Sequence, residues 1–462
     1  MLIFHGRKVS SNAPMKVAPA GDRAILVTLP EASASGLRAA ADRVRAIDGV
    51  EACVIGHESL LVVSLRPPLL IANAIANAEE GRSPNAKAHV IEVSFNGEYA
   101  LDLPSLPRDE ILARIAEVRL EVRFLGFRPG FAYLDGWPEA WRLPRRPTSR
   151  NKVPFGSFAI AGAFAGFYAV DSPGGWNILG RTVAPLWDPR REPPNLLAPG
   201  DTIAIVPTLD KLQLTPPRNR ETQQPSNLYD VISPGQLTTI VEKRDWRKAE
   251  HGEPPGGPFD LPAAIAANRA AGNDDDAPLF ECVLVGPRLR FREAARAAWC
   301  GGNGVVRVYD IRKDEEINIG RIHGGLRGYL AIGKKAGPVE NVARGEPRVI
   351  RVMRGPHDSP FVDSDWEVTP QLDRAGIRLR PLGTPVTSQP ADLPSCGMQF
   401  GTVQWHPDGS LIVMGPDHPV TGGYLQPATV LSDDLWKLAQ LAPADRVRLE
   451  CGGKATAFAS PG

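Results

Sequence analysis

The sequence has few of the residues that build metal centres or disulfide frameworks. Its 462 residues include only five cysteines, an odd number that forms no Cys-x-x-Cys pair. Its eight histidines form no His-Glu-x-x-His pattern. We therefore expect buried thiols, with no structural metal and no disulfide bonds. The acidic run at residues 274–276 is interpreted as a loop at the end of a helix.

An excess of charge of one sign and a long apolar run are also missing. Fifty-three basic residues face 52 acidic ones, so the net charge of +1 does not favour a nucleic-acid-binding protein. The longest apolar stretch, residues 158–170, is too short to span a bilayer. The first residues lack the apolar core of a secretory signal, and translation starts at either Met1 or Met15. We expect a cytoplasmic protein that binds neither membrane nor nucleic acid.

Glycine and proline, in contrast, are abundant. The chain has 45 of each, which excludes a long helical bundle and favours short strands joined by tight turns. At roughly 150 residues per domain, the length alone predicts about three domains.

The pattern of apolar residues predicts a small α/β domain followed by a β-barrel. Residues 16–95 alternate between strands and two helices in the order of a ferredoxin-like domain, with residues 90–95 as its closing strand. A helix is predicted at 107–118, after which glycine and proline interrupt strand-like segments as far as residue 207. The polar residues 218–226 are predicted to form a linker.

Two pairs of turn motifs recur in the same order. Pro-Gly-Gly-Trp at 173–176 precedes Leu-Ala-Pro-Gly-Asp at 197–201, and Thr-Gly-Gly-Tyr at 421–424 precedes Leu-Ala-Pro-Ala-Asp at 441–445. Each second turn leads into a closing strand, so the repetition predicts two related β-barrels. The Gly-Gly pairs either permit positive φ in a tight turn or bring bare amides close to an anionic ligand.

Residues 125–182 closely resemble the first allophanate-hydrolase-subunit domain family. The resemblance is carried by Gly-Phe-x-Pro-Gly-Phe at 126–131, Pro-Arg-Arg at 144–146 with Arg150, and Ser-Pro-Gly-Gly-Trp with Gly-Arg-Thr at 172–182. Gly-Asp-Arg-Ala at 21–24 fits the start of the same family. This family includes the 5-oxoprolinase B subunit, a sporulation-kinase inhibitor and part of urea carboxylase.

The second half resembles the companion family, the second allophanate-hydrolase-subunit domains of the 5-oxoprolinase C subunit. Asn268, Glu281, the Leu-Asp-Arg-Ala-Gly-x-Arg-Leu run at 372–379 and Asp417 with 421–424 follow its motifs. Three motifs are altered, at residues 241–245, 257–260 and 372–375. This half is therefore divergent.

The two resemblances together imply a natural B–C fusion with a β-rich α+β fold. The implied order is a ferredoxin-like domain at 16–95, a cyclophilin-like barrel at 96–210, a linker at 211–227, a β-rich domain with one helix at 228–346 and a second cyclophilin-like barrel at 347–452. The implied activity is ATP-dependent opening of 5-oxoproline to glutamate, with Mg²⁺ and a separate LamB/YcsF-like A subunit. Homo-oligomers are compatible with the sequence, and no biotin-attachment segment is present.

Ring opening of a lactam requires cations for phosphate and carboxylates for magnesium or water. No P-loop is present, so we predict binding of substrate or nucleotide by arginines, because guanidinium pairs well with phosphate, and by the two Gly-Gly turns. The predicted catalytic residues are Asp417, Asp373 and Asn268. The predicted binding residues are Arg145, Arg146, Ser172, Gly174, Gly175, Trp176, Arg181, Arg374, Thr421, Gly422, Gly423 and Tyr424.

Two other functions stay open at this point. One is a carboxyltransferase or amide-cleaving module of the kind found in allophanate and urea metabolism. The other is a non-catalytic regulatory protein like the kinase inhibitor, which the altered motifs of the second half favour.

Overall fold

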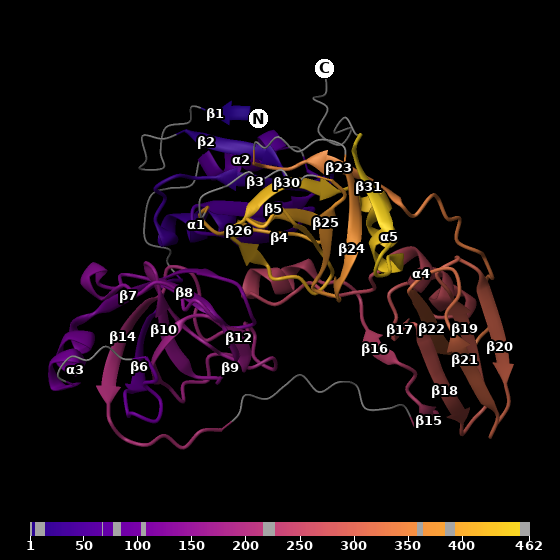
Figure 1. Cartoon of the computed structure of the whole chain (residues 1–462), viewed down its shortest axis with the longest axis horizontal. Coiled ribbons are helices and arrows are strands. Elements are labelled where there is room, and N and C mark those ends of the chain that lie inside the picture. The colour runs from indigo at the N-terminus through magenta and orange to yellow at the C-terminus, as the bar shows by residue number, and fades with distance from the viewer. Residues whose placement is uncertain are drawn as a thin grey trace.

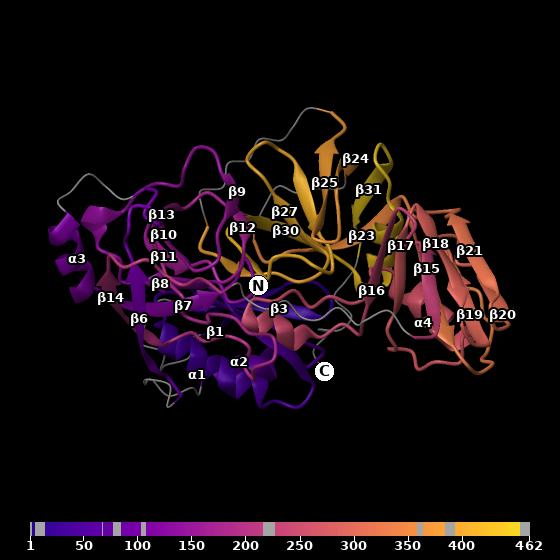
Figure 2. The ribbon, with the colours of Figure 1, turned by 90° about the horizontal axis from the view of Figure 1, so that it is seen from below.

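The computed structural model describes residues 2–4, 14–66, 68–76, 85–102, 108–215, 227–357, 364–383 and 393–452. The predicted linker residues 218–226 lie outside these ranges. Figures 1 and 2 show a first barrel at one end and a second β-rich domain at the other, with the amino-terminal domain and the last barrel side by side between them. None of the helices in these ranges is long and apolar enough to cross a membrane.

The amino-terminal domain is a sheet with the strand order β1-β2-β3-β5-β4. Its elements are β1 (Leu2–Phe4), β2 (Met15–Pro19), β3 (Ala24–Thr28), α1 (Ala34–Arg45), β4 (Val50–Ile55), β5 (Ser59–Ser64) and α2 (Pro68–Ala76). Ser33 caps the amino terminus of helix α1, because its hydroxyl accepts a hydrogen bond from the amide of Gly36. Both helices bury their apolar residues in one cluster with the sheet, as the helical spacing of Leu37, Ala41 and Val44 predicts.

The prediction that residues 90–95 close this domain is wrong. That segment forms β6 (Ala88–Ser94), which belongs to the first barrel and pairs in parallel with β14 (Thr202–Thr208). The place beside β3 is taken instead by β2, which comes before β3 in the chain. Since β2 already completes the sheet on that side, the next strand is free to join a different one.

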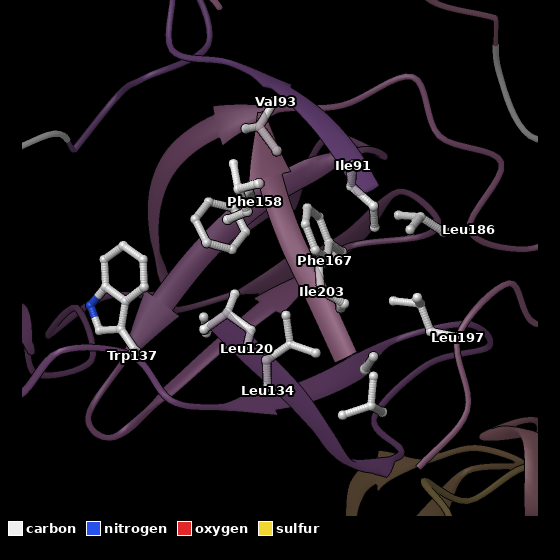
Figure 3. Packing of buried hydrophobic residues seen from close by; sticks show 14 of the residues in the cluster. Ile91, Val93, Leu120, Leu134, Trp137, Phe158, Phe167, Leu186, Leu197 and Ile203 are labelled. Carbon is white, nitrogen blue, oxygen red and sulfur yellow. The ribbon is translucent and has the colours of Figure 1, made fainter. Parts of the chain in front are cut away.

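The first barrel is closed by seven strands. In spatial order they are β10 (Ser157–Ala161), β11 (Phe164–Phe167), β8 (Ala132–Asp135), β7 (Arg119–Leu125), β14, β6 and β13 (Asn177–Arg181). Helix α3 (Arg108–Glu117) lies between β6 and β7 in the chain, and β9 (Arg150–Val153) pairs with β12 (Ser172–Gly174) as a separate ribbon. Figure 3 shows Leu120, Phe158, Phe167 and Ile203 packed together in the barrel core, all of them buried.

The second β-rich domain, which follows the first barrel in the chain, holds two sheets and one α-helix. A three-stranded sheet is formed by β15 (Tyr229–Ser233), β18 (Val285–Phe291) and β21 (Glu316–Arg321). A five-stranded sheet is formed by β16 (Leu237–Val241), β17 (Leu279–Val283), β22 (Arg327–Gly333), β19 (Ala295–Cys300) and β20 (Val306–Ile311). Helix α4 (Leu261–Ala270) packs on the larger sheet, and the 3-10 helix η2 (Trp246–His251) precedes it.

The last barrel repeats the topology of the first, which confirms the predicted pair of related barrels. Its order is β23 (Val349–Arg354), β30 (Leu425–Val430), β27 (Thr402–Trp405), β28 (Leu411–Met414), β25 (Gly376–Pro381), β24 (Ser364–Leu372) and β31 (Arg446–Cys451). Strand for strand this matches β6, β13, β10, β11, β8, β7 and β14, and in both barrels the first and last strands pair in parallel. The ribbon of β26 (Cys396–Gly397) and β29 (Thr421–Gly422) corresponds to β9 and β12. The predicted fold class is therefore confirmed.

The two Leu-Ala-Pro-x-Asp turns have the same hydrogen bonds. The carboxylate of Asp201 accepts from the amide of Ala198 at 3.0 Å, and that of Asp445 accepts from the amide of Ala442 at 2.8 Å. The residue before each aspartate has positive φ, at 83° for Gly200 and 70° for Ala444. A local sequence motif thus specifies the same entry into the parallel strand twice.

The amino-terminal sheet joins the two halves of the chain. The face opposite its helices packs against Ala249, Cys396 and Val420 of the second half. The carboxylate of Asp22 accepts a hydrogen bond from the amide of Ser432, and Arg45 pairs with Glu250 of η2 at 3.0 Å. A short helix, α5 (Leu435–Gln440), follows Ser432 and ends near the second β-rich domain.

Candidate functional site

A cavity of about 550 Å³ lies where the second β-rich domain meets the last barrel. Its lining brings together the three altered motif segments and the carboxylate of Asp417. Lys243 comes from the first segment, Gly257 from the second and Arg374 from the third. Segments that are more than 100 residues apart in the sequence therefore form one site, and we call it the Arg374 cavity.

Arg374 is the central cation of this cavity. Its guanidinium donates to Asp417 at 2.7 and 2.9 Å, to Glu281 at 2.7 Å and to the carbonyl of Gly257 at 2.9 Å. Burial by itself lowers the pKa of Arg374, but Glu281 and Asp417 outweigh it and raise the pKa above its ordinary value. The two carboxylates differ, because the side chain of Glu281 is 2% exposed and that of Asp417 is 41% exposed. Asp417 is the one that solvent or a ligand reaches.

Glu281 is held from several directions. It accepts a hydrogen bond from the hydroxyl of Tyr329 at 2.8 Å and from the amide of Phe259 at 2.9 Å. Arg327 lies 3.6 Å from it and stacks over the ring of Phe259. Burial, followed by the charge of Glu281, keeps the pKa of Tyr329 well above its usual value, so its hydroxyl stays a donor. This network fixes the position of Arg374.

Arg244 supports the wall of the same cavity. It donates to the carbonyls of Gly256 and Pro258 and stacks over Phe400 at 4.6 Å. Burial lowers the pKa of Arg244 to about 10, and the nearby charge of Arg374 adds to the effect. Arg244 therefore fixes the loop whose Gly257 carbonyl accepts a hydrogen bond from Arg374.

The other predicted catalytic residues lie outside this lining. Asp373 accepts hydrogen bonds from the amides of Ala375 and Gly376 and so stabilises the turn beside Arg374. Asn268 is fully buried on α4, and its amide donates to the carbonyls of Asp275 and Ala277. In these contacts Asp373 and Asn268 stabilise the local backbone. Of the three predicted catalytic residues, Asp417 is the one that lines the cavity.

The arginines of the first half form a separate group. Arg146 and Arg150 both donate to Asp102, at 2.7 and 2.9 Å, and the amide of Arg146 donates to the carbonyl of Gly175. Arg145 is exposed and has no hydrogen bond or ion pair with any other described residue. Of these three arginines, Arg145 alone has a guanidinium without a partner among the described residues.

The Gly-Gly-Trp turn packs tightly inside the first half. A side chain on Gly174 would collide with the hydroxyl oxygen of Tyr168, and Trp176 is buried edge-on against Phe131. Ser172 pairs with Val153 in the ribbon. Arg181 donates to the carbonyl of Phe155 at 2.8 Å and stacks on its ring at 4.7 Å. The contacts shown by these residues are structural.

The Thr-Gly-Gly-Tyr segment lies at the joint between the two halves and not at the Arg374 cavity. A side chain on Gly126 would collide with the hydroxyl oxygen of Thr421, so the first-half motif touches the second-half one. Gly422 pairs with Cys396, and the carbonyl of Gly423 accepts from Leu393. The ring of Tyr424 lies 4.1 Å from that of His406.

Sequence reasoning missed Glu281, Arg327 and Arg244 as members of the site. A signal was present, because Glu281 and Arg327 are charged residues on strands that are otherwise apolar and buried. A buried charge of this kind needs a partner of opposite charge. Here Glu281 on β17 and Arg327 on β22 lie 3.6 Å apart.

The Arg374 cavity does not fit a magnesium–triphosphate group. Arg374 is fully engaged, Lys243 pairs with Asp276 at 2.8 Å, and Lys248 lies 4.0 Å from Glu253. Within the described ranges no group of three His, Cys, Asp or Glu side chains is placed to hold a metal ion. We therefore assign no step to ATP in this cavity.

The chain belongs to the carboxyltransferase-domain family. Residues 15–197 match the family model for its subdomains C and D, and residues 251–342 and 335–451 match the model for subdomains A and B. The class of protein is therefore a carboxyltransferase-type chain in which the C–D half comes first.

The relatives identify the two halves more closely. Over 179 residues the chain is 34% identical to the 5-oxoprolinase B subunit of Escherichia coli O157:H7, a match that covers 36% of this chain and 82% of that protein. Over 273 residues it is 24% identical to the 5-oxoprolinase C subunit of Escherichia coli K12, covering 46% of this chain and 88% of that protein. The chain thus joins a half similar to the first of these proteins to a half similar to the second.

A solved structure shares the whole arrangement. The crystal structure of TTHA0988 superposes with a TM-score of 0.78 at 26% sequence identity, over 93% of this chain and 100% of that one. The two halves are therefore placed relative to each other as in a crystallised relative.

Proposed function

We propose that this chain is the B–C component of an ATP-dependent amidohydrolase that opens 5-oxoproline to glutamate together with a separate LamB/YcsF-like subunit. The observation that carries the proposal is the convergence of the motif segments on the Arg374 cavity. The relatives named as B and C subunits of 5-oxoprolinase support it.

The cavity supplies two of the groups that lactam opening needs. Asp417 presents a partly exposed carboxylate, which is suited to holding a water molecule against the amide carbonyl. Arg374 holds that carboxylate with two hydrogen bonds and so sets its direction. The cations of the Arg374 cavity, Arg374, Lys243 and Lys248, are already paired with carboxylates. In this proposal the LamB/YcsF-like subunit therefore supplies the other groups that the reaction needs beside the lactam.

The proposal is tested by turnover of the reconstituted complex. The purified chain is mixed with a cognate LamB/YcsF-like subunit, ATP, magnesium and 5-oxoproline, and glutamate and ADP are measured. We expect Asp417→Asn to lower kcat at least about 100-fold while Tm changes by less than about 4 °C, because the side chain is partly exposed. The matched control is Asp408→Asn, an exposed carboxylate of the same barrel that pairs with Arg378 outside the cavity.

Other outcomes separate the alternatives. Near-normal turnover of Asp417→Asn removes this residue from the mechanism. Turnover with another cyclic amide or a urea derivative, but not with 5-oxoproline, replaces the substrate. No turnover with any of them, together with tight binding to a kinase, establishes a regulatory protein.

A further inference from the structure

A second cavity, of about 360 Å³, lies between the second β-rich domain and the other end of the last barrel. One wall consists of the turns that join β19 to β20 and β21 to β22, and the other of α5 and the Leu-Ala-Pro-Ala-Asp turn. We call it the Trp436 cavity, after the half-buried indole of α5 that lines it. None of the predicted site residues lines it.

Three glycines bring bare backbone to this cavity. A side chain on Gly302 would collide with the backbone of Gly325, and one on Gly325 would collide with the amide oxygen of Gln440, so glycine is favoured at both positions. Gly324 has a φ of 76°, which also favours glycine. In the described part of the chain, the amide groups of Gly302, Gly324 and Gly325 have no hydrogen-bond acceptor. Adjacent unpaired amides of this kind bind anions.

The other lining groups suit the remaining parts of a nucleotide. Arg348 is exposed, and its guanidinium has no acceptor among the described residues. Guanidinium binds phosphate oxygens in pairs. The indole of Trp436 offers an aromatic surface of the kind on which bases stack. One oxygen of Asp445 is used by Ala442, which leaves the other to accept from a sugar hydroxyl.

The walls of the cavity are held in place by a buried network. Gln440 accepts from the amide of Arg327 at 3.2 Å and donates to Asp260 at 2.8 Å. Asp260 also pairs with Arg344 at 2.7 Å, and Arg344 stacks on Trp436 at 4.5 Å. The indole and the glycine turns are therefore pre-organised, which lowers the entropic cost of binding.

We propose that the Trp436 cavity binds an adenine nucleotide, with its phosphates on the glycine amides and Arg348 and its base against Trp436. The proposal deepens the proposed function, because it gives ATP a place on this chain away from the Arg374 cavity. It is nevertheless tested without turnover, so that failure of the amidohydrolase reaction and failure of nucleotide binding are separate results.

The experiment is calorimetric titration of the purified full-length chain with ADP, adenosine and inorganic phosphate, with tryptophan fluorescence as a second readout. We expect ADP to bind at least about tenfold more tightly than either part alone, since both groups of contacts are then used. Arg348→Ala is expected to weaken ADP at least about tenfold and to leave adenosine unchanged. Trp436→Phe is expected to remove the fluorescence change.

The matched control is Arg307→Ala, which removes an exposed arginine of β20 that lines neither cavity. Arg348 is also exposed, so both variants are expected to melt at the temperature of the unmodified chain. The proposal is overturned if ADP does not bind at millimolar concentration. It is equally overturned if Arg348→Ala and Arg307→Ala bind ADP alike, or if ADP binds without changing the fluorescence of Trp436.

Discussion

Replacing Arg374 tests whether the two carboxylates of the Arg374 cavity have different roles. Arg374→Met keeps much of the side-chain volume but removes the charge. Glu281 is then left buried at 2% exposure, with the hydroxyl of Tyr329 and the amide of Phe259 as its remaining donors and Arg327 at 3.6 Å. Asp417, at 41% exposure, is instead taken up by water.

The expected magnitudes follow from this difference. Breaking a buried ion pair from one side costs about 3–5 kcal/mol, and the remaining donors of Glu281 place Arg374→Met near 3 kcal/mol. For a unit of about 200 residues this is a fall in Tm of about 6–12 °C. Asp417→Asn disturbs only the exposed arm of the pair and is expected to cost at most about 1 kcal/mol.

The assay is thermal unfolding followed by circular dichroism, with Glu281→Gln added to Arg374→Met as the decisive variant. In Arg374→Met the buried charge of Glu281 keeps only Arg327, at 3.6 Å, as a counter-charge among the described residues. Removing the charge of Glu281 is therefore expected to recover part of the lost stability, since the Arg374–Glu281 pair is then replaced by neutral groups. The reasoning is refuted if Arg374→Met and Asp417→Asn lower Tm equally, or if the double variant is no more stable than Arg374→Met alone.

Two further predictions concern a buried histidine and the joint between the halves. Burial lowers the pKa of His418 to about 4. The hydrogen bond to Pro419 opposes this shift, and the charge of Arg244 adds to it. Above pH 6.5 His418 is neutral in both the folded and the unfolded chain, and between pH 6.5 and 4 only the unfolded chain takes up a proton. The free energy of unfolding therefore falls by about 3 kcal/mol as the pH is lowered over that range. Unfolding measured against pH should show a shallower slope for His418→Asn, and equal slopes would contradict the assignment. Gly126→Ala is expected to lower the free energy of unfolding by roughly 1–3 kcal/mol, because the added carbon meets Thr421. The control is Gly345→Ala, whose added carbon meets nothing within 4 Å, and chemical denaturation should show no change for it.

The candidate site was only partly predictable from the sequence. Arg374 and Asp417 were found because each lies in a recognisable motif, and the structure joins them by two hydrogen bonds. Glu281 was not assigned a role, because its importance depends on the burial of strand β17 against a cation from the last barrel. The Gly-Gly turns were predicted as binding elements, but their conformation is required by neighbours such as Tyr168 for Gly174.

What the sequence determined by itself is local. The helical spacing of Leu37, Ala41 and Val44 and the turns ending at Asp201 and Asp445 both involve residues a few positions apart, so these patterns could be recognised in the sequence. The repetition of turn motifs likewise indicated two related barrels before their strands were known.

The tertiary structure alone decided which strand joins which sheet and which motifs meet. Strand β6 enters the first barrel because it pairs with β14, more than 100 residues later, while β2 fills the place beside β3. Arg374 meets Glu281 only after the last barrel has packed against the second β-rich domain, and Gly126 meets Thr421 only after the two halves have folded against each other. Pairings across such distances depend on the packing of whole domains, which no local pattern of residues encodes.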